Sequence, residues 1–476
     1  MKRELRPLLA ALATPRISGT LPETVTEIAV DSRTAVPGSL FVAVRGERAD
    51  GHRFALGAVA RGATVLVVEH EVDVDVPQVI VEDTRVAISR LADAYYDHPS
   101  QGLVVFGVTG TNGKTTTTYL LRAIAEAAGL PCGVIGTLGG MFGERTWALE
   151  NTTPLALELH RVLAEMRAAG ARAVAMEVSS HALALGRVDD VRFRAAALTN
   201  VTRDHLDFHG TLARYIAAKR HLFDLAPQAV FNVDDPVGRT FAGEFITATT
   251  YAIERVAQLR ATNIELQGYE TRFDAGGLHV QMALPGRFNV ANALAAIGLA
   301  RAADIDDGAI VRGLATARAV PGRMERIGAF GIDAIVDYAH TPDALANVLR
   351  AARETTRGRL IVVFGCGGDR DAGKRVEMGR IAAEAADAVI VTSDNPRGES
   401  PAAIAAAVAA GIVAEVILDR RAAIRRAIND ARAGDTVVVA GKGHESYQII
   451  GEERLPFDDR DEVRSAFSLR SGALRA

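Results

Sequence analysis

The sequence has few cysteines, no long apolar run and no strong excess of charge of either sign. Its two cysteines, Cys132 and Cys366, stand far apart, which excludes a disulfide-stapled secreted scaffold and suits a reducing compartment. No segment approaches the roughly 18 uninterrupted apolar residues of a membrane-spanning helix. The opening stretch MKRELRPLLAALATP has a short apolar core interrupted by Glu4 and Pro7, so we interpret it as mature sequence and not as a signal peptide. We expect a cytoplasmic protein without membrane insertion.

The overall composition excludes one class of partner and bounds the number of domains. The 54 basic and 58 acidic side chains leave a formal charge of −4, so no basic field favours nucleic acid as a partner. Hydrophobic residues at 49% and charged residues at 24% are typical of a globular protein with a sizeable core. The length of 476 residues corresponds to about three domains of roughly 150 residues each.

Apolar runs and helical patterns alternate along most of the chain. Strands are expected at 39–46 and 63–69, with a short helix between them. From residue 99 onward, β-branched runs alternate with helical patterns, which predicts a mainly parallel sheet. Short alternating runs from about 240 to 285 suit an antiparallel insertion, and a helix is expected over 289–303. Further strands are expected at 332–338, 359–366, 387–393, 414–418 and 435–440.

These patterns predict an α/β fold in three domains. The first is a small mixed α/β N-domain, residues 1–98, which ends at the Pro- and Gly-containing segment YYDHPSQG. The second, 99–320, is a central P-loop-type domain with a mainly parallel sheet. The third, 321–476, is a Rossmann-like α/β domain that follows the turn-rich stretch AVPGRMERIG.

The stretch VVFGVTGTNGKTTTT has the order of a strand, a phosphate-binding loop and a helix. A strict G-x-x-x-x-G-K-[ST] loop would need glycine at position 108, where this chain has Val108. Gly110 and Gly113 still allow backbone N–H groups to approach phosphate oxygens. Lys114 would lie along the β- and γ-phosphates of ATP, and Thr115 would offer its hydroxyl to Mg²⁺. The alternative is a glycine-rich turn with a solvated lysine.

Further polar clusters stand at the ends of expected strands, where open α/β sheets bind their ligands. They are EVSSH (177–181), TNVTRDHLDFHG (199–210), DYAHTPD (337–343), GCGGDRD (365–371), SDNPR (393–397) and AGKGHE (440–445). Two sheets with such edges suggest two half-sites that face one cleft.

Two of these clusters offer candidate metal ligands. Glu177 ends an apolar strand and could hold a metal or its water, or else cap a helix. His205 and His209 have the i,i+4 spacing of some zinc sites. Because no cysteine accompanies them and a phosphate loop calls for Mg²⁺, we favour hard-cation and polar-contact roles. A capping loop is the alternative for this cluster.

Assembled, the motifs resemble the Mur ligase family over nearly the whole chain. They follow in family order: DSR, GTNGKTTT, NTTP, EVSSHAL, LTNVTRDHLDFHG, AAKR, PGRFNVANALAA, PGRMERI, DYAHTPDAL, GCGGDRDAGKR, SDNPRGE and GKGHESYQ. The family's loop is GTNGKT, so Val108 is compatible with ATP binding. The resemblance implies that ATP converts a substrate carboxylate into an acyl phosphate, which an incoming amine then attacks to form an amide.

The resemblance also implies roles for individual residues. The ATP site would comprise Gly110, Thr111, Asn112, Gly113, Lys114, Thr115, Thr116, Asn292, Arg323 and Asp337. Catalysis would rest on Lys114, Glu177, His205 and Lys219, and the metal ligands would be Thr115, Glu177, His205 and Lys219. Lys219 in AAKR matches a lysine that the family carries as a carbamate, although by sequence alone it is an ordinary helix lysine.

The nucleotide-linked substrate implied is UDP-N-acetylmuramoyl-L-alanyl-D-glutamate. Its contacts would be Val30, Ser32, Glu47, Arg48, Ala49, Asn151, Thr152, Thr153, Ser179 and Arg187. Family members often have Gln two residues before the last of these, where this chain has Leu185, and this puts one polar contact to the substrate in doubt.

The DNPR run selects the amino acid that is added. Arg397 can form two charge-assisted bonds with the second carboxylate of meso-diaminopimelate but would repel the terminal ammonium of lysine. The resemblance agrees, because DNPR goes with the diaminopimelate-adding subtype. The pocket would comprise Arg370, Asp394, Asn395, Pro396, Arg397, Gly441 and Glu445. NPRG could also be only a turn.

Four other functions remain open at this point. Within the family, the chain could add lysine at the same step, or it could be the next ligase, which adds a dipeptide. Outside it, the chain could be a nucleotide-gated binding module or a kinase that stops at a phosphorylated product. The small molecules ATP, the nucleotide-linked dipeptide and the amino acid are the expected partners.

Overall fold

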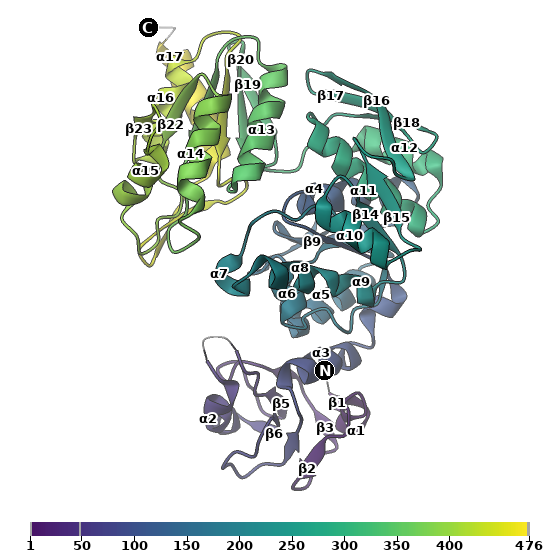
Figure 1. The fold of residues 1–476 in the computed structure, drawn as a ribbon. Coiled ribbons are helices and arrows are strands. Elements are labelled where there is room, and N and C mark those ends of the chain that lie inside the picture. The colour runs from purple at the N-terminus through teal and green to yellow at the C-terminus, as the bar shows by residue number, and fades with distance from the viewer. Residues whose placement is uncertain (1, 47–48, 474–476) are drawn as a thin grey trace. The chain divides into compact units, whose positions relative to one another are not determined.

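The computed structural model describes residues 2–46 and 49–473 (Figure 1). They form two compact units. One takes the residues up to Thr109 together with Gly129–Ala197 and Ala217–Ala229. The other takes Gly110–Ala128, Leu198–Ile216 and the residues from Val230 onward. The boundaries of the three domains near 98 and 320 stay a prediction.

The N-terminal part of the first unit is a five-stranded sheet in the order β2-β7-β6-β5-β4. Its strands are β2 (Arg16–Ser18), β4 (Ile28–Ala29), β5 (Ser39–Val42), β6 (Ala63–Val68) and β7 (Gln78–Ile80). β4 to β7 run parallel, and β2 pairs antiparallel with β7. Leu40 and Val42 enter one core cluster and Phe41 the other, so both faces of this sheet are buried. The two strands predicted here are confirmed.

Short helices cover this sheet. They are α1 (Leu5–Leu9), η1 (Gly51–Phe54), α2 (Ala55–Ala60) and α3 (Thr84–Tyr95), and η2 (Pro99–Gly102) follows; β1 (Arg3–Glu4) and β3 (Thr24–Val25) form a separate pair. The short helix predicted between the two strands is η1 together with α2.

The rest of the first unit continues as an α/β sheet. The order is β11-β10-β9-β12-β8-β13. The strands are β8 (Val104–Thr109), β9 (Cys132–Gly136), β10 (Gly139–Phe142), β11 (Arg145–Trp147), β12 (Ala173–Glu177) and β13 (Phe193–Leu198). β12 pairs parallel with both β8 and β9, whereas β10 and β11 are antiparallel additions that the sequence analysis missed. The helices here are α5 (Ala156–Ala168), α6 (Ser180–Ala184), α8 (Leu212–Arg220) and α9 (Leu222–Leu225).

The second unit begins with the helix after the phosphate loop and a further set of strands. They are α4 (Lys114–Ala127), α7 (Leu206–His209), β14 (Ala229–Asn232), α10 (Pro236–Glu244), β15 (Thr249–Ala252), β16 (Leu259–Gln267), β17 (Glu270–Ala275), β18 (Leu278–Met282), α11 (Arg287–Ala302) and α12 (Asp307–Thr316). The antiparallel insertion is smaller than predicted, because β15 pairs parallel with β14 and β16 and only β16 to β18 are antiparallel. α10 supplies the crossover that parallel pairing of β14 and β15 requires.

The C-terminal part of this unit is a six-stranded sheet in the order β19-β20-β24-β21-β22-β23. Its strands are β19 (Glu325–Ala329), β20 (Ile332–Asp337), β21 (Leu360–Phe364), β22 (Ala388–Val391), β23 (Glu415–Val416) and β24 (Thr436–Ala440). All pairs are parallel except β19 with β20. The five strands predicted in this part are confirmed; β19 and the hairpin of β25 (Tyr447–Ile450) and β26 (Glu453–Pro456) were not predicted.

Helices cover both faces of this last sheet. Leu360, Val362 and Phe364 share one core with α13 (Pro342–Thr355), α14 (Lys374–Ala385) and α15 (Pro401–Ala409). Ile361 and Val363 share the other with α16 (Arg420–Asp430) and α17 (Asp459–Ala473). Figure 1 shows α13, α14 and α15 together on one face. This is the doubly wound arrangement expected of a Rossmann-like part, and the predicted three-part α/β fold class is confirmed.

None of the described helices is long and apolar enough to span a bilayer. Both cysteines are buried and reduced.

His160 lies buried in α5 without a hydrogen bond to either ring nitrogen in the described part of the chain. Its Nδ1 is 3.4 Å from Asp93 Oδ1 of α3. Burial lowers the pKa of His160 to about 4; Asp93 opposes this shift and His98 adds to it. The buried imidazole is therefore neutral near pH 7.

This histidine predicts a specific acid sensitivity. Below pH 6.5 the unfolded chain binds a proton that the folded His160 refuses until about pH 4, so stability falls as the pH falls through this window. Between pH 7 and pH 5 the His160 contribution is about 2 kcal/mol. We expect H160L to unfold with a correspondingly smaller pH dependence, measured by urea unfolding at both pH values. Equal pH slopes for the two proteins would contradict this prediction.

Candidate active site

The phosphate loop follows β8 and is built on two glycines with positive φ. Gly110 has φ 150° and Gly113 has φ 88°. A Cβ at Gly110 would collide with Thr199 Oγ1, and one at Gly113 would collide with Asn292 Oδ1. Only glycine fits both positions, so the loop presents backbone N–H groups at the start of α4, as an anion site requires.

A second segment, residues 199–202, fixes the shape of this loop. Asn112 N–H donates to Asn200 Oδ1 (2.9 Å), and Thr111 N–H donates to the Asn200 carbonyl (2.8 Å). Thr199 Oγ1 donates to the Asn112 carbonyl at 2.6 Å. Three groups of the loop, the N–H groups of Thr111 and Asn112 and the Asn112 carbonyl, are therefore held by this segment. Sequence reasoning placed this segment at a strand end but did not assign it this supporting role.

Lys114 and Thr115 occupy the first turn of α4. Lys114 Nζ donates to the carbonyls of Gly110 and Thr111, each at 2.9 Å, so the ammonium lies over the loop. Arg323 Nη2 donates to Thr115 Oγ1 at 3.1 Å. Two predicted ATP residues more than 200 positions apart are thus brought into contact.

The remaining predicted ATP residues lie beside these. Asn292 Nδ2 donates to Asn289 Oδ1 at 3.0 Å, which holds Asn292 against the loop. Asp337 ends β20 and accepts from the backbone N–H groups of Met324 and Ala339, both at 2.8 Å. Burial raises the pKa of Asp337, although Arg323 and these two hydrogen bonds oppose the shift. In this geometry Asp337 fixes the turn that carries Arg323. Thr116 is buried in the first turn of α4.

Asp204 and His205 follow the supporting segment. His205 precedes α7 with φ 52°, and its Nε2 is 3.3 Å from Asp204 Oδ2. Burial would raise the pKa of Asp204, but the surrounding positive groups outweigh it and lower that pKa; they are His205, His340, Lys374 and Lys114. An anionic Asp204 therefore lies within a basic environment. His209 instead packs its ring against Tyr215, which fits a core position better than a zinc ligand.

In the first unit, Glu177 ends β12 and is almost fully buried at 1% exposure. Its Oε1 accepts from Thr137 N–H (2.9 Å) and its Oε2 from Thr137 Oγ1 (3.1 Å). The cap of α6 is Ser179, which accepts from Ala182 N–H, so Glu177 is not a helix cap. Thr137 thus orients this carboxylate, a role that could not be predicted from the sequence.

Residues predicted to contact the nucleotide-linked substrate also gather around Glu177. Thr153 Oγ1 donates to the Glu177 carbonyl (2.9 Å) and accepts from Ser179 N–H (3.0 Å). Arg187 Nη1 donates to the Thr153 carbonyl at 3.0 Å. Thr152 Oγ1 is 3.2 Å from Thr137 Oγ1. Asn151 precedes this cluster in the chain, and Leu185 lies just after α6.

Lys219 of α8 is also buried, at 1% exposure. A lysine placed so deeply costs free energy as a bare cation unless its charge is matched or changed. This burial distinguishes Lys219 from the ordinary helix lysine that the sequence alone predicts.

The predicted substrate residues of the N-terminal sheet are partly described. Val30 packs against the core cluster that contains Leu40. Ser32 lies next to it in the turn after β4, and the carbonyl of Ala49 accepts from Gly46 N–H at 3.0 Å. The predicted contacts Glu47 and Arg48 lie outside the described residues.

The predicted amino-acid pocket lies beyond β21, β22 and β24. Arg397 has φ 52°, its N–H donates to the Ile449 carbonyl (3.2 Å), and its carbonyl accepts from Gly451 N–H (2.8 Å). Its Nη1 donates to the Gly368 carbonyl at 2.8 Å. The backbone of Arg397 and one nitrogen of its side chain are thus fixed by the protein. The Pro396 carbonyl leaves no space for a Cβ at Gly368.

A buried lysine, Lys442, contacts two of these predicted pocket residues and was not selected from the sequence. Lys442 Nζ donates to Asn395 Oδ1 and to Glu445 Oε2, each at 3.0 Å, and Lys442 is fully buried. Asn395 Nδ2 donates to the same Glu445 oxygen at 2.9 Å. Two predicted amine ligands, Asn395 and Glu445, are thus held by each other and by a cation. Their predicted contacts with the amino acid stay predictions.

A second buried cation, Arg420, joins the loops that follow β22 and β24. Arg420 and Asp459 are both fully buried and joined by two hydrogen bonds of 2.7 Å. Arg420 also donates to the carbonyls of Ser393 (3.3 Å) and Ala440 (3.0 Å). These carbonyls precede Asp394 and Gly441, so one guanidinium joins the two loops on which predicted pocket residues stand. Arg370 is more exposed and lies 3.8 Å from Asp207 Oδ2.

The predicted magnesium ligands have the right chemistry for a hard cation, because Thr115 and Glu177 offer oxygen atoms. Within residues 2–46 and 49–473, no cluster of three or more His, Cys, Asp or Glu side chains forms a metal site. The predicted set contains only Glu177 and His205 of these types, so its remaining oxygen donors would come from Thr115 and a carbamate on Lys219.

Comparisons with known proteins agree with these features. Three family models match the chain: "Mur ligase family, catalytic domain" at residues 24–96, "Mur ligase middle domain" at 108–300 and "Mur ligase, glutamate ligase domain" at 322–443. Together they cover most of the sequence.

Curated relatives match over nearly their whole length. The UDP-N-acetylmuramoyl-L-alanyl-D-glutamate--2,6-diaminopimelate ligase of Gloeobacter violaceus is 46% identical and the one of Syntrophomonas wolfei 45% identical; each match covers 93% of this chain and 94% of the relative. A solved structure of a ligase of the same name is 35% identical, with a TM-score of 0.67 and coverage of 94% of this chain and 96% of that one. The chain belongs to the Mur ligase family.

Proposed function

We propose that this chain is the ATP-dependent ligase that adds meso-2,6-diaminopimelate to the D-glutamate of UDP-N-acetylmuramoyl-L-alanyl-D-glutamate during peptidoglycan precursor synthesis. The observation that carries the proposal is the match to relatives named for this reaction over more than nine-tenths of both chains. The phosphate loop at Gly110–Thr116 and the DNPR loop at 394–397 supply the chain's own matching chemistry.

The reaction proceeds through an activated carboxylate. A D-glutamate carboxylate oxygen attacks the γ-phosphorus of ATP, and the bond from that phosphorus to the β,γ-bridging oxygen breaks to release ADP. The amine of diaminopimelate then attacks the acyl carbon, loses a proton and expels phosphate to leave the amide. A carboxylate is a poor electrophile, so phosphorylation supplies the leaving group, and the protein contributes mainly positioning and charge neutralisation.

Several of the predicted residues have a role in this scheme. Lys114 turns from its loop carbonyls toward the β- and γ-phosphates, and the loop N–H groups bind phosphate oxygens. Arg323, which donates a hydrogen bond to Thr115, would neutralise charge on the transferring phosphoryl group. Thr153, Ser179 and Arg187 would contact the nucleotide-linked substrate.

Thr115, Glu177, His205 and a carbamate on Lys219 would hold Mg²⁺, which neutralises phosphate charge when bound. The burial of Lys219 supports the carbamate: a carbamate converts a buried cation into an oxygen ligand for the metal. ATP use follows from family membership, whereas we propose that the protein also uses Mg²⁺ and a carbamate on Lys219. We also propose that the protein works in the cytoplasm, where its small-molecule substrates are found.

Amide formation with different amines tests the function. With ATP, Mg²⁺ and the nucleotide-linked dipeptide, we expect phosphate release and a product heavier by one diaminopimelate residue, and far less product with lysine or with D-alanyl-D-alanine. Equal or better turnover with lysine would favour the lysine-adding alternative. Phosphate release without an amine would favour a kinase, and nucleotide binding without turnover would favour a binding module.

A further inference from the structure

Two neighbouring loops carry the guanidinium groups of the proposed amino-acid pocket. Residues 365–373 follow β21 and contain Arg370, and residues 392–400 follow β22 and contain Arg397. β21 and β22 are adjacent and parallel, with Phe364 opposite Val391. The relative position of these two loops therefore determines the distance between the two guanidinium groups.

Glu399 ties the two loops together. Its Oε1 accepts from the backbone N–H of Asp369 at 2.6 Å and from Arg375 Nη2 at 2.8 Å. In return, Asp369 Oδ2 accepts from the N–H of Gly398 at 3.0 Å. Each loop thus offers one carboxylate to one backbone N–H of the other, so two reciprocal hydrogen bonds join the loops.

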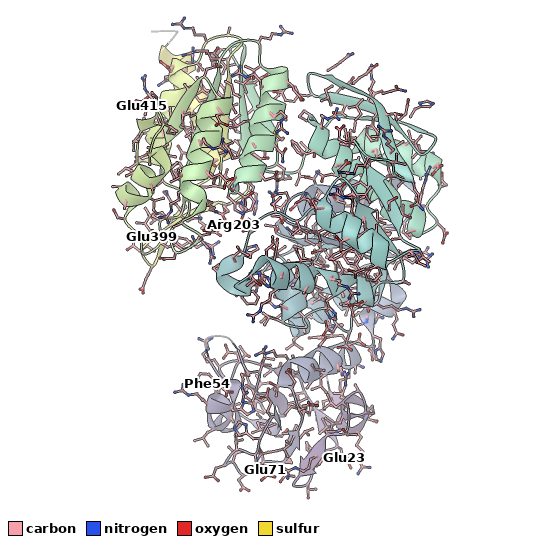
Figure 2. The ribbon with its side chains drawn as sticks, in the orientation of Figure 1. Glu23, Phe54, Glu71, Arg203, Glu399 and Glu415 are labelled. Atoms are coloured by element: carbon pink, nitrogen blue, oxygen red, sulfur yellow. The ribbon has the colours of Figure 1, made fainter. Side chains whose placement is uncertain are left out.

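The side-chain partner of Glu399, Arg375, is buried. Arg375 lies in the first turn of α14, and its side chain is only 8% exposed, against 34% for that of Glu399. Figure 2 labels Glu399 by the loops beyond α14 and α15. Because Glu399 Oε1 bonds one group of the neighbouring loop and one of α14, we assign Glu399 to the support of the loops.

The turn that Glu399 holds is one that the backbone does not favour alone. Asp369 has φ 52°, in the left-handed region of backbone conformation that residues other than glycine adopt less often. Arg370 is the next residue, so the direction of its side chain depends on this conformation. Arg397 on the other loop also has φ 52° and is joined to the first loop through the Gly368 carbonyl.

We propose that Glu399 is a positioning residue for amino-acid selection, which acts by fixing the left-handed turn at Asp369 and so the placement of Arg370 relative to Arg397. The inference rests on the proposed function, because Arg370 and Arg397 both belong to the predicted diaminopimelate pocket, in which Arg397 would bind the second carboxylate. Glu399 itself forms no bond with the substrate. Its loss loosens the pocket without removing any of the groups that contact the amino acid.

Steady-state kinetics of the full-length protein test this inference. We expect E399A to raise KM for diaminopimelate by between about tenfold and a hundredfold and to lower the kcat/KM ratio of diaminopimelate to lysine by a similar factor. The kcat, the KM for ATP and the KM for the nucleotide-linked dipeptide should change less than about twofold, because those sites lie on other loops. E399Q keeps an acceptor for the Asp369 N–H and should recover most of the wild-type KM.

A matched control uses another glutamate paired with an arginine near α14. Glu384 pairs with Arg380 at 2.5 Å on the exposed face of that helix, away from both loops. E384A should leave every kinetic constant unchanged. If E399A does not fold, D369G, which suits the left-handed turn but removes the acceptor for the Gly398 N–H, carries the same readout of KM and selectivity.

Two results would overturn the inference. One is an unchanged KM and selectivity for diaminopimelate in folded E399A. The other is an equal rise of all three KM values together with a lower melting temperature, since that describes a general loss of structure. Failure of the proposed function is separate: it would appear in the wild-type protein, as absent amide formation with diaminopimelate, before any variant is compared.

Discussion

Lys219→Met abolishes most ligase turnover while the chain stays folded; this is the largest effect that we expect. The methionine preserves side-chain volume in a position that is only 1% exposed, so the core around α8 remains filled. What disappears is the nitrogen that can carry a carbamate. Loss of one oxygen ligand from a site that neutralises phosphoryl charge should lower kcat by about 10²- to 10³-fold. Phosphate release with saturating diaminopimelate measures the effect.

A neighbouring residue provides the control for this experiment. Arg220 follows Lys219 on α8, but its guanidinium is half-exposed and pairs with Asp224 at 3.1 Å. R220M should retain nearly full activity. Carbon-13 NMR with labelled bicarbonate adds a direct readout, because the wild-type protein should show a carbamate resonance that K219M lacks. A K219M protein with more than about a tenth of wild-type kcat, or a wild-type protein without the resonance, would refute the carbamate.

Arg397→Lys should lose much of the preference for diaminopimelate over lysine. In the structure Nη1 of Arg397 is bound to the Gly368 carbonyl, so the remaining donors are the ones that can pair with a second carboxylate. A lysine ammonium can satisfy Gly368 or the ligand but cannot fork onto both. We expect kcat/KM for diaminopimelate to fall by about a hundredfold or more. Competition between the two amino acids, resolved by product mass, measures the change.

The matching control changes an arginine of the same part of the chain. Arg426 on α16 is half-exposed, pairs with Glu415 at 3.2 Å and is not among the predicted pocket residues. R426K should leave both amino acids unaffected. If R397K also leaves the two kcat/KM values unchanged, Arg397 does not select the amino acid, and the lysine-adding alternative regains weight.

Much of the fold was predictable because its strands are buried on both faces. Runs such as LIVVF at β21 and TVVVA at β24 alternate between two cores, and this leaves continuous apolar sequence that turn residues delimit. The missed elements lack this signal. β19, β10 and the β25–β26 hairpin are short, partly exposed and antiparallel, so tertiary pairing and not local pattern forms them.

The candidate site shows the same division. Four site residues could be selected from the sequence, because their residue types are typical of binding sites and they stand near the ends of expected strands. They are Gly110, Lys114, Glu177 and Arg397. Four supporting residues could not be selected in this way, because each contacts a site residue that is distant in the sequence. They are Thr137, Asn200, Lys442 and Glu399. Thr137, for example, reaches Glu177 across 40 positions. The depth of Lys219 was equally hidden, since burial belongs to the packing of α8 and not to the sequence AAKR.

The two glycines of the phosphate loop have a consequence for mutational escape. A compound that replaces the phosphates of ATP would rest on a surface made of backbone, with Thr199 and Asn292 directly behind it. Any side chain introduced at position 110 or 113 collides with one of those partners before it can obstruct the compound. Resistance would have to arise elsewhere, at residues the compound touches but the fold does not constrain, which makes the cradle a durable target for inhibitors.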